Sequence, residues 1–69
     1  IISVNQAMNL IVIKTLPGMA QAAASALDSM HLEECTGTIA GDDTIFAACP
    51  GIDEAKALAI TISDMMEKG

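Results

Sequence analysis

Positive charge and aromatic side chains are nearly missing from this sequence. Its 69 residues include three lysines and nine acidic residues but no arginine, so the formal net charge is −6. A chain with this balance cannot build the basic surface that nucleic-acid phosphates require, and we expect these residues to bind neither DNA nor RNA. Phe46 is the single aromatic residue. The core must therefore consist of aliphatic, methionine and alanine side chains.

Cysteines and long apolar runs are also scarce. Cys35 and Cys49 are too few for a disulfide framework and too far apart for a zinc knuckle. A hairpin that turns at Asp42 would place them opposite each other, which permits a disulfide, but free thiols in a cytoplasmic protein are the preferred interpretation. No apolar stretch approaches the ~20 residues of a membrane span, and no signal peptide is visible. We predict a cytoplasmic protein without a membrane partner. Because the chain opens at Ile1 inside an apolar run, we also interpret it as an excised part of a longer protein.

Apolar residues, in contrast, are abundant for so short a chain. They make up 52% of the sequence, and the mean hydropathy is +0.50. A domain of this size buries only about 60% of the surface that its unfolded chain exposes, so apolar surface remains for a partner. The run from Leu10 to Ile13 is apolar on both faces of a predicted strand, and two helices readily cover only one face. We therefore predict a homo-oligomer.

Turn residues divide the chain into six predicted elements. The apolar runs at residues 1–4 and 10–16 indicate two strands separated by a polar turn at residues 5–9, and residues 35–40 and 44–49 indicate a hairpin. Residues 19–30 predict a helix, and a second helix is expected after Pro50-Gly51 with Asp53 as its N-cap. The order ββαββα predicts one α+β domain over residues 1–69. We expect a two-layer sandwich in which two helices cover one face of an antiparallel-rich, four-stranded sheet.

Each predicted helix has an apolar stripe at helical spacing. The stripes that we assign to the core comprise Met19, Ala23, Ala26, Leu27 and Met30 in the first helix and Ile52, Ala55, Leu58, Ile62 and Met65 in the second. Gln21, Ser25 and Asp28 share a separate, polar stripe on the first helix. His31 lies at the C-terminal end of this helix, where the negative end of the helix dipole attracts a positively charged side chain.

The tip of the predicted hairpin carries two adjacent carboxylates, Asp42 and Asp43. Aspartate is common in turns because its side chain bonds nearby backbone N–H groups, so an ordinary turn is one interpretation. Two neighbouring carboxylates in an acidic chain also favour a bound cation, which could be a metal ion, a lysine or a guanidinium group. No further oxygen ligands follow at EF-hand-like spacing, and no serine has a histidine–acid pair beside it. The residues alone leave both interpretations of the turn open and favour a binding module over an enzyme.

Two strings of residues resemble the C-terminal domain of the bacterial arginine repressor. They are Leu16-Pro17-Gly18-Met19-Ala20-Gln21 and Gly37-Thr38-Ile39-Ala40-Gly41-Asp42-Asp43-Thr44-Ile45-Phe46. The similarity runs from about Asn9 to the end of the chain and includes the ββαββα order. It implies a domain that senses L-arginine and forms trimers, two of which stack into a hexamer with arginine bound between them. It also implies a separate N-terminal winged helix-turn-helix domain, absent from this chain, that binds operator DNA.

The resemblance further implies six ligand-binding positions of three kinds. By this resemblance, Gln21 and Asp28 contact the amino-acid end of the ligand. Thr38 and Ala40 line the site, and Asp42 and Asp43 receive the guanidinium. L-Arginine is then a corepressor, and the domain has no cofactor, metal or catalytic residue. A small acidic metal-binding domain and a purely structural assembly domain remain as alternatives.

Overall fold

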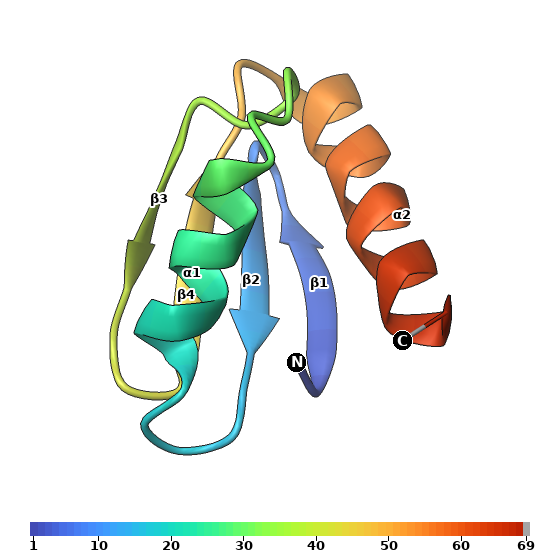
Figure 1. The fold of residues 1–69 in the computed structure, drawn as a ribbon. Coiled ribbons are helices and arrows are strands. Elements are labelled where there is room, and N and C mark those ends of the chain that lie inside the picture. Colours follow the sequence, from blue (N-terminus) through green and yellow to red (C-terminus); the bar gives the residue numbers. More distant parts are fainter. Residues whose placement is uncertain (69) are drawn as a thin grey trace.

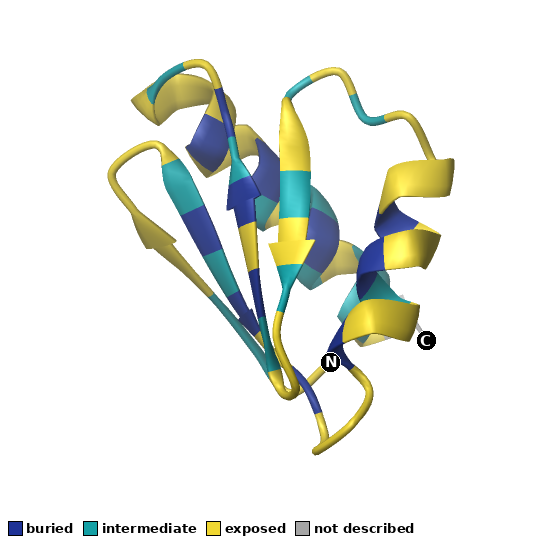
Figure 2. Ribbon diagram, turned by 90° about the vertical axis from the view of Figure 1, so that its left-hand side faces the viewer, coloured by how far each residue is buried: buried dark blue, intermediate teal, exposed yellow. Residues whose placement is uncertain are grey.

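The computed structural model describes residues 1–68 of the chain. Six elements follow the predicted order (Figure 1): β1 (Ser3–Ala7), β2 (Leu10–Lys14), α1 (Ala20–Ser29), β3 (Gly37–Ala40), β4 (Thr44–Ala48) and α2 (Ile52–Lys68). The strands form one antiparallel sheet in the order β1-β2-β4-β3, and both helices lie on the same face of it (Figure 2). The predicted two-layer α+β sandwich is confirmed.

The core lies between the sheet and the two helices. The two central strands and both helices contribute its buried aliphatic side chains, which are Ile11, Ile13, Ile45, Ala47, Ala20, Ala24, Leu27, Ala55, Leu58 and Ile62. Alternate residues of β2 and β4 point to the same face of the sheet, so each strand supplies two of them. The small side chains of Ala20 and Ala24 let α1 approach the sheet closely.

The first hairpin differs from the prediction. We expected a polar turn over residues 5–9, but β1 continues to Ala7, and only Met8 and Asn9 connect it to β2. Polar residues are tolerated in β1 because it is an edge strand with an exposed side. The Gln6 side-chain amide also secures this hairpin, donating to the backbone carbonyls of Met8 at 2.9 Å and of Ile52 at 3.0 Å. The second strand ends at Lys14, two residues earlier than predicted.

The predicted apolar stripes were partly wrong. In α1 the buried side chains are Ala20, Ala24 and Leu27, whereas Met19, Ala26 and Met30 are exposed. The helix is therefore rotated from the predicted orientation, because its alanines permit more than one apolar face.

The start of α2 also differs. Ile52 is 53% exposed at the first position of the helix, so Asp53 lies in the first turn and is not the N-cap. There the carboxylates of Asp53 and Glu54 face the positive end of the helix dipole. Further along the helix, Ala55, Leu58 and Ile62 are buried as predicted, and Met65 is half-buried.

The second hairpin turns at Gly41-Asp42-Asp43, as predicted. Both strands are shorter than expected, so Cys35 and Cys49 lie outside them as free thiols. The register pairs Gly37 with Ala48, and the cysteines are consequently offset instead of directly opposite each other. Burial raises the pKa of the Cys49 thiol.

The sheet face away from the helices carries a row of apolar side chains. Val12, Phe46 and Ile39 are register partners on three adjacent strands, with Phe46 49% and Ile39 74% exposed. Ile11 and Ile13 of the same central strand are fully buried on the opposite face, so the strand is apolar on both sides as predicted. In the part of the chain described, no helix combines the length and the apolar character that crossing a membrane requires.

Candidate functional site

The predicted site residues belong to α1 and to the β3–β4 hairpin, which lie beside each other at one edge of the molecule (Figure 1). A turn at Leu16-Pro17-Gly18-Met19 brings the chain from β2 into α1. Its Gly18 has a φ of 79°, and the Met19 N–H donates to the Leu16 carbonyl at 3.1 Å, as in a type II turn with proline second and glycine third. The Pro-Gly string therefore determines where α1 begins.

The Asp42-Asp43 turn is held against this start of α1 by its own backbone. The carbonyl of Asp42 accepts a hydrogen bond from the Ala20 N–H at 3.2 Å, and the carbonyl of Asp43 accepts one from the Thr15 N–H at 2.8 Å. Gly41 closes the turn by donating to the Thr44 carbonyl at 2.8 Å. These bonds occupy main-chain atoms, while both aspartates are exposed.

At the other end of α1, Asp28 meets β3. The Thr38 hydroxyl donates to Asp28 Oδ1 at 2.9 Å, which fixes the orientation of the carboxylate. Thr38 and Ala40 are half-buried on the side of β3 that faces α1, whereas Ile39 between them points to the open face. The structure thus brings Asp28 and Thr38 into direct contact.

Gln21 lies on the same side of α1 as Asp28 but near the opposite end. Seven residues separate them, which is close to two helical turns and about 10.5 Å along the axis. Gln21 is exposed and directly follows Ala20, which bonds the Asp42 carbonyl. The six predicted positions therefore form two groups, with Gln21, the aspartate turn and the adjoining Ala40 at one end of α1 and Asp28 with Thr38 at the other.

Two further residues, Thr44 and Lys14, contact the aspartate turn and were not predicted from the sequence. Thr44 donates through its hydroxyl to Asp43 Oδ1 at 2.9 Å and accepts from Lys14 Nζ at 2.8 Å. Lys14 is also the register partner of Thr44. The sequence did show Lys14 as a polar residue at the end of the otherwise apolar β2. The strand pairing was needed to place it beside Thr44. Lys14 thus puts a positive charge close to one of the two carboxylates.

The arrangement suits a cationic ligand with several hydrogen-bond donors. Three carboxylates, those of Asp28, Asp42 and Asp43, are exposed along this edge. Binding sites usually cover 70–90% of a small ligand, and this open edge of one chain covers much less. Within residues 1–68, no three His, Cys, Asp or Glu side chains lie close enough together to hold a metal ion.

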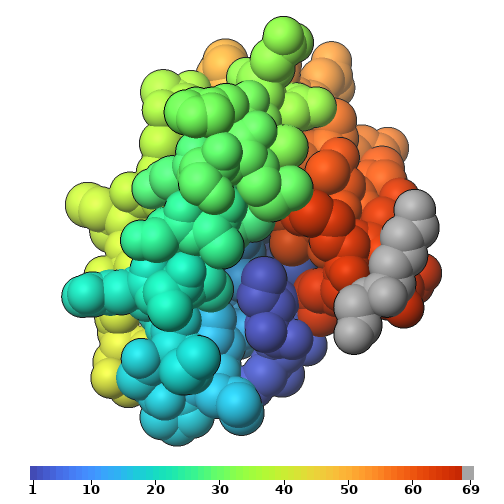
Figure 3. Space-filling model, in the orientation of Figure 1, coloured from blue at the N-terminus to red at the C-terminus, as the bar shows by residue number. Residues whose placement is uncertain are grey.

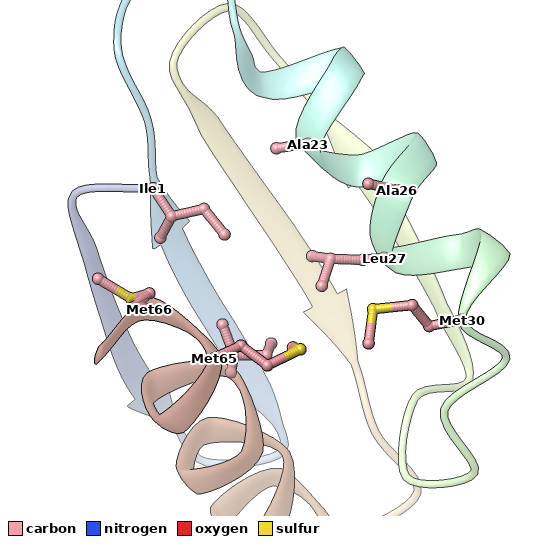
Figure 4. Close-up of a pocket in the computed structure, with 8 residues that line it drawn as sticks. Ile1, Ala23, Ala26, Leu27, Met30, Met65 and Met66 are labelled. Carbon is pink, nitrogen blue, oxygen red and sulfur yellow. The ribbon is translucent and has the colours of Figure 1, made fainter. Parts of the chain in front are cut away.

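An apolar cavity lies elsewhere, between α1 and α2. It has a volume of about 550 Å³ and is lined by Ile1, Ala23, Ala26, Leu27, Met30, Ile62, Met65 and Met66 (Figure 4). The first residues of the chain, dark blue in Figure 3, lie between the two helices there. Its lining has no charged side chain, so this groove does not suit a cationic ligand.

A smaller pocket of about 180 Å³ opens at the end of α1. Its lining residues are Leu27, Asp28, His31, Leu32, Cys35, Thr36 and Gly37. Burial raises the pKa of the Cys35 thiol there; a hydrogen bond with the Gly37 backbone opposes this, and the nearby Asp28 charge adds to it. This pocket adjoins the second group of predicted site residues through Asp28.

Comparison with known proteins gives consistent matches. Residues 1–64 match the family described as the arginine repressor, C-terminal domain. An arginine repressor of Acetivibrio thermocellus is 48% identical over 64 residues, which cover 93% of this chain and 42% of that protein. One from Caldicellulosiruptor saccharolyticus is 46% identical over 69 residues, covering 100% of this chain and 45% of the relative. One from Alkaliphilus oremlandii is 61% identical over 46 residues, which cover 67% of this chain and 31% of that protein. The chain thus spans less than half the length of these curated relatives.

Proposed function

This chain belongs to the arginine repressor C-terminal domain family, and from that premise we propose that it is the L-arginine-sensing oligomerisation domain of a transcriptional regulator of arginine metabolism. Repressors regulate transcription and are not enzymes. The observation that carries the proposal is the separation of the carboxylates into two groups at the two ends of α1.

A ligand with two cationic groups suits two separate groups of carboxylates. A guanidinium presents five N–H donors in a plane that match carboxylate oxygens, which suits Asp42 and Asp43. An α-ammonium needs an anion such as Asp28, whose orientation is fixed by Thr38. Gln21 and Ala40 lie beside the aspartate turn. Because the two groups are far apart and exposed on one chain, we infer that facing chains share each arginine.

Assembly into trimers uses another surface. The open sheet face carries Val12, Phe46 and Ile39 in one row, which supports an apolar contact between copies of the chain. The polar edge of α1 and the aspartate turn remain available for a contact between two trimers. We therefore propose a hexamer formed from two trimers, with arginine bound where they meet and acting as a corepressor.

DNA binding is assigned to a part of the regulator outside this chain. The chain carries a formal net charge of −6 and spans less than half the length of its relatives. We propose that a winged helix-turn-helix domain preceding it in the full protein contacts operator DNA, and that this regulator acts in the cytoplasm.

Sedimentation of the chain with and without L-arginine tests the proposal. We expect the ligand to shift the chain toward hexamer, because a ligand that binds only the assembled form stabilises it by mass action. Calcium in a parallel thermal-shift titration tests the metal-binding alternative. A rise in melting temperature with calcium but not with arginine would contradict arginine sensing, and no response to either would indicate a structural assembly domain.

A further inference from the structure

One apolar stripe of α1 is left largely uncovered within residues 1–68. Met19 and Ala26 are exposed, Met30 is 46% exposed, and Ala23 is half-buried. These four positions have the spacing i, i+4, i+7 and i+11, so they follow one line along the helix and its two ends. The sequence pattern assigned this stripe to the core. Since exposed apolar patches of this kind mark interaction surfaces, we expect a further element to cover it.

Two adjoining cavities follow the stripe. The first is the apolar groove of about 550 Å³ between α1 and α2. The second, of about 300 Å³, lies beside the start of α1 and is lined by Ile1, Thr15, Leu16, Met19, Ala22 and Ala23. The cavities share Ile1 and Ala23, so they form one continuous surface. Among the described residues, no charged side chain lines either of them.

Ile1 lies where the two cavities meet. The Ile2 N–H donates to the Lys14 carbonyl at 2.6 Å, so Ile2 is still paired with the sheet. The Ile1 side chain, in contrast, lies between the two helices, on the same side of the groove as Met66 (Figure 4). Consecutive Cα atoms are about 3.8 Å apart, so a residue bonded to the Ile1 nitrogen begins at this surface.

We propose that the residues preceding Ile1 in the full regulator dock along this groove and cover the apolar stripe of α1. Two findings support the existence of such residues. The matching family is described as a C-terminal domain, and the chain covers 42% and 45% of two of its relatives. Because the segment is joined to Ile1, its effective concentration at the groove is on the order of millimolar, which favours it over a second copy of the chain.

The groove determines the chemistry of the docked segment. Between Met19 and Met30 the stripe is about 16 Å long, which about five extended or about eleven helical residues would span. The alanines of the stripe leave room for large side chains, and the methionines adapt to their shape. We therefore expect an amphipathic segment whose aliphatic or aromatic side chains face the groove.

Docking here connects the two proposed activities through one helix. The polar side of α1 carries Gln21 and Asp28, whereas its apolar stripe faces the groove. The docked segment thus orients the preceding DNA-binding domain relative to the ligand site. This goes beyond arginine sensing and does not depend on it.

Methyl NMR of the full-length regulator, with its methionine methyl groups labelled, tests the docking directly. We expect cross-peaks from the Met30 and Met65 methyl groups to residues that precede Ile1. Met8 is 70% exposed between β1 and β2 and lines neither cavity, so it serves as an internal control without such cross-peaks. Their absence from Met30 and Met65, or cross-peaks to another copy of the chain instead, would overturn the inference.

Limited proteolysis of the same full-length regulator provides a second test. Ala26→Glu places a charge in the groove, so cleavage before Ile1 should be about tenfold faster, because it follows the fraction of time that the segment is undocked. Ala57→Glu adds the same charge to an exposed alanine of α2 outside the groove and should be cleaved at the wild-type rate. Equal cleavage of the two variants would contradict docking. Neither measurement involves arginine, so a failure here is distinct from a failure of arginine sensing.

Discussion

Replacing Asp43 by asparagine removes one negative charge from the turn with almost no change in shape. The amide oxygen can still accept the hydrogen bond that the Thr44 hydroxyl now gives to Asp43 Oδ1 at 2.9 Å. The backbone bond from the Thr15 N–H to the Asp43 carbonyl is unaffected. Because the side chain is exposed, we expect the free energy of unfolding without ligand to change by less than about 0.5 kcal/mol.

Ligand binding should respond much more strongly. A hydrogen bond to a charged group contributes about 1.5–3 kcal/mol, which corresponds to roughly tenfold to more than hundredfold in affinity. Asp43→Asn should therefore lose most of the arginine-induced shift toward hexamer. The empty hexamer need not weaken, because the change also removes repulsion between facing carboxylates.

Sedimentation velocity across an arginine titration measures this effect, with Asp53→Asn as the matched control. Asp53 is also an exposed aspartate, but it lies in the first turn of α2, away from the candidate site. The control should behave like the wild-type chain. If Asp43→Asn gains hexamer with arginine as strongly as the control, the carboxylate pair is not the sensor.

Three further predictions follow from the charge, the open sheet face and the buried thiol. Citrulline has a neutral urea in place of the guanidinium, so calorimetry should show binding weaker than that of arginine by about 2–4 kcal/mol, and equal affinities would refute the assignment of Asp42 and Asp43. Phe46→Asp places a charge in the apolar row of the open sheet face. Light scattering should then show a smaller assembly, while circular dichroism still shows a folded chain. An unchanged mass would exclude this face as the interface between copies. Burial raises the pKa of the Cys49 thiol above its ordinary value of 9.0, so the thiol of the unfolded chain loses its proton at lower pH than that of the folded chain. The free energy of unfolding should therefore fall as the pH rises past about 9. Cys49→Ala should reduce that fall, and an unchanged pH dependence in this variant would show that Cys49 does not cause it.

Local patterns predicted most of the fold. The Pro17-Gly18 pair and the Gly41-Asp42-Asp43 tip marked turns that the structure contains, because Gly18 adopts a φ of 79° and aspartate is common in turns. The first hairpin was placed less well, since the contacts that hold it, such as Gln6 to Ile52, join residues far apart in the sequence. The rotation of α1 was also wrong, because a helix rich in alanine offers several apolar faces of similar strength.

The candidate site was less accessible to sequence reasoning. Composition and spacing identified an acidic turn and a polar stripe containing Gln21 and Asp28, but the family resemblance assigned their roles. Nothing in the spacing joined Thr38 to Asp28 or Lys14 to Thr44, because both pairs depend on how strands and helix are placed in space. The interpretation of His31 as a partner of the helix dipole stays a prediction.

The charge of the proposed assembly indicates where a bound arginine would act. Each chain has a formal net charge of −6, and one bound arginine of net charge +1 neutralises one sixth of it. A change this small in the total charge cannot by itself switch the assembly between trimer and hexamer, particularly because salt screens charges more than about 8–10 Å apart. We therefore expect the effect to be local, at the Asp42-Asp43 turns, where in the proposed assembly carboxylates of facing chains repel each other when empty and share guanidinium groups when filled. Since the backbone carbonyls of the same turn bond Ala20 and Thr15, the turn is held in place before the ligand arrives, and little of the binding energy is needed to order it.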